Sequence, residues 1–241
     1  MFTTAHFIWL GTIAAVIAIL LTVSVKCKVP THTVHRVAAA VLAVLKVFHL
    51  SLSMKESTFG GLVISQTQLS FHLCSIMVYA VILTTFIKNE KLLATLKSFM
   101  TPCLMIGALM ALLIPTEGVD AAAPRVWQYM LIHGVLVFYG IYLAFVEKTD
   151  LSLRAYLSNL KCLTVVMIAG FLMNSVLEAY GTNFLFLREP PMADLPILNL
   201  DNGWYVYFLS LLAVACLLLF LVHLPYVVSR ALKRKKEARP E

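Results

Sequence analysis

Seven long apolar stretches occupy most of this 241-residue chain. A helix needs about 20 predominantly apolar residues to cross the hydrocarbon core of a bilayer, where its backbone polar groups must all be satisfied internally. The predicted spans are residues 6–25, 36–54, 69–87, 92–115, 127–146, 160–180 and 204–228. Only 13% of the residues are charged, against about 25% in a typical soluble domain. We therefore predict an all-α, polytopic membrane protein in which residues 1–229 form a bundle of seven transmembrane helices.

The connections between these spans alternate in charge. Lysine and arginine concentrate after the first, third and fifth spans and in the residues that follow the seventh, whereas the remaining connections hold more acidic than basic residues. Cytoplasmic connections of membrane proteins carry an excess of Lys and Arg. We therefore expect the N-terminus outside and the C-terminus in the cytoplasm, and an even number of spans would break this pattern.

Residues 230–241 form a basic tail after the last span. Its basic residues are Arg230, Lys233, Arg234, Lys235, Lys236 and Arg239. Clusters of this kind next to a membrane helix bind anionic lipid headgroups of the cytoplasmic leaflet. We expect such headgroups as partners of the tail, and no nucleic acid, because no basic patch interleaved with aromatic residues accompanies it.

A histidine and a cysteine stand near the start of the third span, as His72 and Cys74. Ionisable and reactive groups inside a membrane segment are energetically costly and mark candidate functional sites. With the predicted orientation, Cys74 lies roughly 7 Å and His133 roughly 9 Å from the outer ends of their helices, at about 1.5 Å per residue. His49 and Asn174 lie about 8 Å and about 9 Å from theirs. Four helices thus carry polar side chains at one level of the outer leaflet half.

Helical spacing predicts which of these side chains share a face. His72 and Cys74 are two residues apart and would point nearly opposite ways, so His72 is a poor base for this thiol. A base from another helix is needed, and His133 fits by its depth. Tyr129 lies one turn before His133 on the same face.

The pairing of a thiol with an imidazole suggests a reaction. A thiol becomes a useful nucleophile when a neighbouring base takes its proton. A Cys74 thiolate in an outer-leaflet pocket would meet the ester carbonyls of glycerolipids, which lie near that depth. Its attack would give an acyl-cysteine, from which a second alcohol accepts the acyl group in a ping-pong scheme that requires no cofactor. We expect His133 to act as the general base, and His72, Asn174 or backbone amides to stabilise the oxyanion.

Further polar residues are expected to complete the site. Lys46 and His49 share one helix face, as do Asn174 and Glu178. A carboxylate such as Glu178 would balance the charge of Lys46, because an unpaired charge is expensive at this depth. The supporting polar groups expected are His49, His72, Asn174, Glu178 and Asn183. The residues expected to bind substrate are Lys46, Gln68 and Tyr129.

The connection before the last span is long, from Gly181 to Gly203. Loops of more than about 12–15 residues are usually functional or disordered. The apolar run Phe184–Leu187 argues against free disorder. We therefore expect this loop to pack across the outer mouth of the bundle, with Asn183 shaping that mouth.

Three patterns, in this order and spacing, resemble those of the YwaF-like integral membrane protein family. They are Gln68–Ser75 (QLSFHLCS), Trp127-Gln128-Tyr129 followed by Ile132-His133-Gly134, and Gly181–Leu187 (GTNFLFL). The family includes the animal transmembrane protein 164, a cysteine-dependent acyltransferase that moves a polyunsaturated acyl chain from a phospholipid to a lyso ether phospholipid without acyl-CoA. The cysteine and histidine of that protein match Cys74 and His133 here.

The resemblance, which covers nearly the whole chain, implies a membrane-embedded acyltransferase. Membrane lipids would be its substrates, with a phospholipid as donor and a lysophospholipid as acceptor. The chain looks like the bacterial members of the family, which implies the bacterial cell membrane as its location, with the site in the outer leaflet half. The fold and the pair of Cys74 and His133 carry over more directly than the substrate does.

Two other functions fit the same residues. A small lipid or solute transporter or binding protein could use the polar cluster of the outer leaflet as its binding site. The sequence has no internal repeat of the kind found in many transporters, which counts against transport. A membrane metal-dependent hydrolase could instead use His49, His72, His133 and Glu178, since side chains of this type hold zinc.

Overall fold

The structure is a computed structural model that describes residues 2–56, 61–192 and 195–237. It is predominantly helical, with one short hairpin. The α-helices are α1 (Thr4–Lys26), α2 (Thr31–Ser53), α3 (Leu73–Thr84), α4 (Glu90–Pro102), α5 (Ala108–Leu113), α6 (Pro124–Phe145), α7 (Leu153–Val176) and α8 (Trp204–Glu237). A π-helix, η2 (Cys103–Gly107), joins α4 to α5, and the 3-10 turns are η1 (Gln66–Gln68), η3 (Glu178–Tyr180) and η4 (Phe184–Phe186). The antiparallel strands β1 (Met54–Glu56) and β2 (Leu62–Ile64) form the hairpin.

Six helical segments in the described part of the chain are long and apolar enough to cross a membrane. They are α1, α2, the continuous rod from α4 to α5, α6, α7 and the apolar part of α8. Each overlaps one of the predicted spans, so the prediction of a helical, multi-pass membrane protein is confirmed. The count of seven spans and the outside position of the N-terminus remain predictions.

The third predicted span, residues 69–87, is helical only in part. Its helix, α3, has 12 residues and rises about 18 Å, less than the hydrocarbon core of about 30 Å. The chain before it is not helical, because His72 is the N-cap and has extended backbone angles (φ −73°, ψ 146°). At the other end the hydroxyls of Thr84 and Thr85 donate to carbonyls three residues earlier, as α3 gives way to a turn.

The sixth predicted span begins at residue 160, whereas α7 already begins at Leu153. The reason is local, because the Ser152 hydroxyl accepts a hydrogen bond from the backbone N–H of Ala155 and so caps the helix. Polar and basic residues follow this cap, so the first two turns of α7 do not belong to an apolar run. Helix α8, in turn, continues through the first part of the predicted tail to Glu237, and residues 238–241 lie outside the described part.

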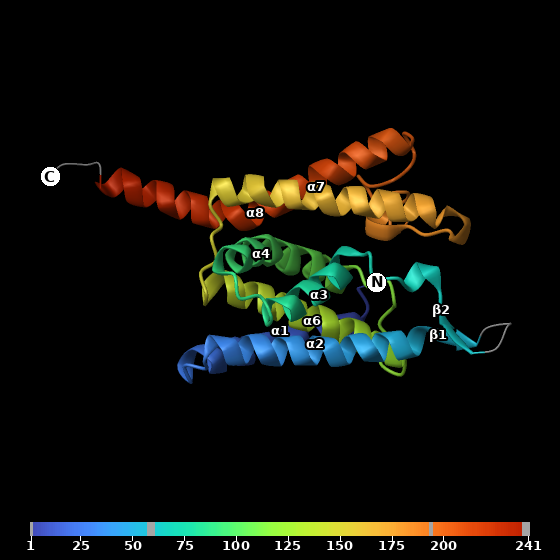
Figure 1. Cartoon of the computed structure of the whole chain (residues 1–241), viewed down its shortest axis with the longest axis horizontal. Helices are drawn as coiled ribbons and strands as arrows, with labels where there is room; N and C mark the ends of the chain where they lie inside the picture. Colours follow the sequence, from blue (N-terminus) through green and yellow to red (C-terminus); the bar gives the residue numbers. More distant parts are fainter. Residues whose placement is uncertain (1, 57–60, 193–194, 238–241) are drawn as a thin grey trace.

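Helix α6 lies at the centre of the bundle, in contact with α1, α2, α3, α4 and α5 (Figure 1). It packs tightly against the π-helix η2. A Cβ atom placed on Gly140 would lie 2.9 Å from Leu104 Cβ and 2.9 Å from the backbone nitrogen of Met105. Only glycine allows α6 to pack so closely against this segment. Helices α7 and α8 form a separate pair that packs against the other helices (Figure 1).

The π-helix η2 directly follows Pro102. Proline has no backbone N–H and disturbs the regular hydrogen bonding of an α-helix. Single π-helical turns inside α-helices are frequent at functional sites. Here the wider turn carries Gly107, which faces the beginning of α3.

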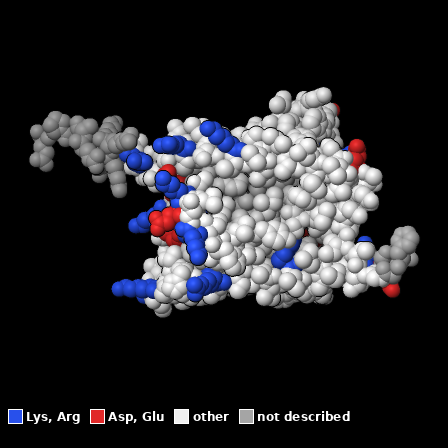
Figure 2. Space-filling view, in the orientation of Figure 1, with Lys and Arg blue, Asp and Glu red and all other residues white. Residues whose placement is uncertain are grey.

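Lysine and arginine side chains gather at the end of the molecule where α1 ends and α4 begins (Figure 2). At this end Glu147 pairs with Lys97 at 2.6 Å and with His35 at 2.7 Å, and the Tyr139 hydroxyl is 2.6 Å from His35 Nδ1. Burial alone would raise the pKa of Glu147, but hydrogen bonds from His35 and Lys97 hold it below its ordinary value. The cluster ties α2, α4 and the end of α6 together.

Candidate functional site

A cavity of about 560 Å³ lies between the α7–α8 pair and the remaining helices. Seven of the ten residues predicted for the site line it: Lys46, His49, Gln68, His72, Cys74, Tyr129 and His133. The other lining residues are mostly apolar and include side chains of η2, α5, α7, α8 and the loop before α8. The cavity is therefore an apolar chamber with a polar cluster on one side.

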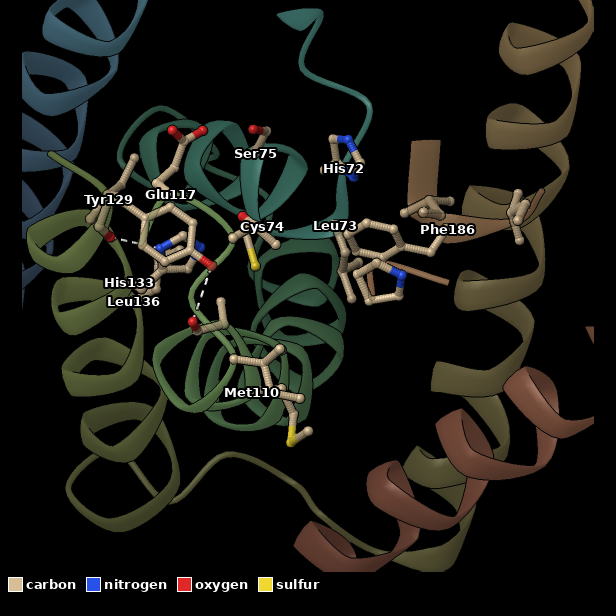
Figure 3. A pocket seen from close by; sticks show the side chains of 18 of the residues that line it. His72, Leu73, Cys74, Ser75, Met110, Glu117, Tyr129, His133, Leu136 and Phe186 are labelled. Carbon is tan, nitrogen blue, oxygen red and sulfur yellow. Dashed lines mark hydrogen bonds between the residues drawn. The ribbon is translucent and has the colours of Figure 1, made fainter. Parts of the chain in front are cut away.

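Cys74 is the second residue of α3, and its thiol points into this cavity (Figure 3). The sulfur faces η2, since a Cβ atom on Gly107 would lie 3.9 Å from it. The expectation that His72 points away from Cys74 assumed that both residues are helical, and this assumption is wrong. His72 is the extended N-cap and not a helical residue, so both side chains line the cavity.

His133 is buried on α6, with 7% of its side chain exposed, and lines the cavity. Its Nδ1 is 2.7 Å from the backbone carbonyl oxygen of Tyr129. A carbonyl can only accept, so Nδ1 carries the proton and Nε2 keeps its lone pair. The Tyr129 ring lies 4.2 Å from the imidazole, and its hydroxyl donates to the carbonyl of Ala111 at 3.0 Å (Figure 3). Tyr129 thus holds the histidine in place through both its backbone and its ring.

Lys46 is a buried cation at the edge of the cavity, with 5% of its surface exposed. Its Nζ donates to the Ser75 hydroxyl at 3.3 Å and lies 5.9 Å from the centre of the Tyr79 ring. Among the described residues no carboxylate lies within ion-pair distance of it. The expected partner Glu178 instead pairs with Arg188 at 3.1 Å on the exposed side of the loop. Lys46 therefore lines the cavity without a carboxylate partner among the described residues.

Asn174 and Asn183 shape the loop and do not line the cavity. The buried Asn174 side chain accepts from the N–H of Phe184 at 2.7 Å and donates to its carbonyl at 3.1 Å. Asn183 accepts from the N–H of Arg188 at 3.0 Å and donates to the carbonyl of Glu189 at 2.9 Å. These contacts make both asparagines anchors of the loop, and the structure brings neither of them to the thiol.

The loop before α8 packs against the bundle and lines the cavity, while its expected position at the outer mouth remains a prediction. The rings of Phe184 and Phe186 lie 5.6 Å and 5.2 Å from the His72 ring. Leu185 and Phe186 both have positive φ (59° and 56°), a strained backbone for residues with a Cβ. Leu185 also packs over Gly170 of α7, where a Cβ atom would lie 2.6 Å from its Cδ1. The tertiary contacts of the loop hold this strained conformation.

Some lining residues were not predicted. Gln128 is buried next to His49, with its Oε1 3.4 Å from His49 Nδ1, and Ser75 meets Lys46. Both belong to the sequence patterns of the resemblance, which is the feature that could have identified them. Glu117 also lines the cavity, 4.0 Å from the Arg125 guanidinium, and nothing in its sequence position pointed to this.

The residues expected for the metal-dependent alternative do not come together in the part of the chain that the structure describes. Within the described ranges, no group of three or more His, Cys, Asp or Glu side chains could hold a metal ion. Glu178, the carboxylate expected among the ligands, lies on the loop with Arg188. His49, His72 and His133 line the cavity without forming such a group.

The chain is similar to a known protein family. The sequence model of the TMEM164 family matches residues 1–223. This is nearly the whole chain, and it confirms the resemblance expected from the three sequence patterns. Neither a search of curated proteins nor a search of solved structures found a match.

Proposed function

The chain belongs to the TMEM164 family, and we propose that it is a membrane-embedded acyltransferase that moves a fatty acyl chain between glycerolipids. Cys74 is the nucleophile and His133 the general base. The donor is a phospholipid and the acceptor a lysophospholipid, and the acyl chain is held on Cys74 between the two half-reactions. The site lies in the outer leaflet half of the membrane.

One observation carries this proposal. A thiol and a neutral imidazole with a free Nε2 lie in one cavity whose walls are otherwise mostly apolar. Nucleophilic catalysis needs such a pair, because the base takes the proton that would keep the thiol unreactive. An apolar wall suits a fatty acyl chain, which an aqueous site could not hold.

In the first half-reaction His133 Nε2 takes the proton of the Cys74 thiol, and the sulfur attacks the ester carbonyl carbon of the donor. A C–S bond forms, and the carbonyl electron pair moves to oxygen. When that oxyanion collapses, the C–O bond to the glycerol breaks, and the leaving alkoxide takes the proton from His133. The products are an acyl-cysteine and a lysophospholipid.

In the second half-reaction the hydroxyl of an acceptor lipid gives its proton to His133 and attacks the thioester carbonyl. A new ester C–O bond forms and the C–S bond breaks. The sulfur recovers the proton from His133, which returns the enzyme to its starting state. His72, which lies beside Cys74 at the cavity wall, supports the oxyanion in both steps.

Lys46 supplies the charge expected of a phospholipid site. It has no carboxylate partner among the described residues, so a bound phosphate group would compensate it. His49, Gln128 and Gln68 also line the cavity and offer further polar contacts to a headgroup. The headgroup would thus sit at the polar cluster, with the acyl chains along the apolar walls.

Mass spectrometry of the purified protein after incubation with phospholipid tests the proposal. We expect an acyl adduct on Cys74 that disappears when lysophospholipid is added. The variant Cys74→Ala should form no adduct and no transferred product. Cys162→Ala is the matched control, since Cys162 is half-buried on α7 and does not line the cavity. Acyl transfer at the normal rate by Cys74→Ala would overturn the assignment and would favour a lipid-binding or transport role for the cavity.

A further inference from the structure

A second cavity of about 580 Å³ lies further along the molecule, between the π-helix η2, the end of α6 and the part of α8 from Leu218 to Ser229. Its lining is apolar apart from Tyr226 and Ser229 at its far end. Among the residues that the structure describes, no histidine, cysteine, carboxylate or basic side chain lines it. Such a wall can recognise hydrocarbon and little else.

The two cavities meet at Met110 of α5 and Leu218 of α8, which line both of them. On the side of the candidate site α8 contributes Leu211, Val214 and Ala215, and on the other side it contributes Val222 and Pro225, among others. Together with Leu218, these positions follow the pattern i, i+3, i+4, i+7, i+11 and i+14, so they lie on one face of one helix. The walls of the cavities therefore form one apolar path along α8.

The catalytic groups stand at one end of this path. The Cys74 sulfur points toward the part of the cavity where Met110 lies (Figure 3). Methionine is unbranched and flexible, so it can move aside for a neighbouring chain. From Leu218 to Ser229 the helix rises about 16 Å, close to the roughly 15 Å of hydrocarbon in one leaflet. The second cavity is therefore long enough to hold the part of an acyl chain that extends beyond the first cavity.

We propose that the second cavity receives the distal part of the acyl chain carried on Cys74, and that Met110 and Leu218 set the chain length the protein accepts. The inference rests on the proposed acyltransferase function. Chains that end before Met110 and Leu218 fill only the first cavity. Longer chains pass between these two residues and gain additional contact along α8.

Competition between donors of different chain length tests the inference. Phospholipids with octanoyl and with octadecanoyl chains are mixed in detergent, and the ratio of the two adducts on Cys74 is measured. Leu218→Trp fills the place where the two cavities meet, and Val222→Trp fills the second cavity one turn beyond. Both should lower the ratio of long to short adduct by about tenfold or more, because several methylene contacts are lost. Leu218→Ala, which widens the path, should shift the ratio in the opposite direction.

The matched control is Leu217→Trp. Leu217 precedes Leu218 on α8, is 57% exposed and lines neither cavity, so the ratio should stay at the wild-type value. If the Leu218 and Val222 variants form adducts in the wild-type ratio, the second cavity does not hold the acyl chain. The inference then fails, while the proposed acyltransferase function stands. If wild-type protein forms no adduct on Cys74 with any donor, the proposed function fails, and the inference with it.

Discussion

The imidazole of His133 donates its Nδ1–H to the backbone carbonyl of Tyr129, one turn earlier in α6, over 2.7 Å. This bond selects the tautomer in which Nε2 can accept a proton. It needs no carboxylate, because a helix carbonyl takes the role that an acid often has in catalytic triads. The orientation of the base thus depends on the backbone of α6, and a substitution at position 129 would leave the bond available.

Replacing His133 by Gln should reduce acyl transfer by about 10²–10⁴-fold, the usual contribution of a positioned general base. Glutamine keeps a donor for the Tyr129 carbonyl but cannot take the thiol proton at neutral pH. The measurement is the rate of adduct formation on Cys74, with thermal unfolding as a check on folding. A rate within a few fold of wild type would show that another group activates the thiol.

Replacing Lys46 by Met should weaken the use of phospholipid donors more than the use of neutral diacylglycerol. A charged hydrogen bond to phosphate contributes about 1.5–3 kcal/mol, so the KM for phospholipid should rise about tenfold or more. Lys46→Arg keeps the charge, so its KM for phospholipid should lie between the values of the wild type and of Lys46→Met. An equal loss with both donors would mean that Lys46 acts on the fold and not on the headgroup.

Replacing Asn174 by Ala removes both hydrogen bonds to Phe184. We expect a loss of about 1–3 kcal/mol in the free energy of unfolding, because buried backbone groups are left unsatisfied. The loop should also become more sensitive to limited proteolysis. Asn174→Asp keeps the acceptor for the Phe184 N–H, so its loss in the free energy of unfolding should be smaller. Unchanged proteolysis in Asn174→Ala would show that the aromatic contacts with His72 suffice to hold the loop.

Replacing Gly140 by Ala should destabilise the protein by about 1–3 kcal/mol, because the new methyl group overlaps η2 and forces α6 away from it. The displacement would also move Gly107 relative to the Cys74 sulfur, so labelling of this thiol by an apolar alkylating reagent should change. Gly11→Ala on α1 is the control, since no atom lies within 4 Å of its Cβ position. Its stability should be unchanged or slightly raised, as alanine favours helix. Equal stability of the two variants would contradict the close packing of α6 and η2.

Acidification should weaken the cluster around Glu147. Its pKa is lowered in the folded protein from an ordinary value of 4.5, so its ion pairs stabilise the fold above that pH. The contribution is lost as the pH falls from about 4.5 through the lowered pKa of the folded state. Glu147→Gln should therefore show a smaller decrease in stability over this range, measured by thermal unfolding in detergent. Parallel curves for the two proteins would show that other groups govern the acid sensitivity.

Much of the fold and part of the candidate site could be predicted from local sequence. Apolar runs long enough to cross a bilayer predicted the six long helical segments, though not the first two turns of α7 or the end of α8, because spanning length and hydropathy are properties of a segment by itself. The placement of Cys74 and His133 in one cavity also followed from depth along two helices, together with the family patterns. Apolar runs alone could not predict the start of α7, which the Ser152 cap sets, or the π-helix that follows Pro102.

The remaining features depend on contacts between distant segments. No helical spacing could predict that His72 is an extended N-cap, since the loop residues Phe184 and Phe186 pack against its ring. Nor could depth alone tell that Asn174 binds the loop backbone while Lys46 stays without a carboxylate. The sequence by itself thus determined which segments are long and apolar enough to cross a membrane and which polar groups they carry. The tertiary structure decided which of these groups meet, because that depends on how the helices are rotated and on where the loop before α8 packs.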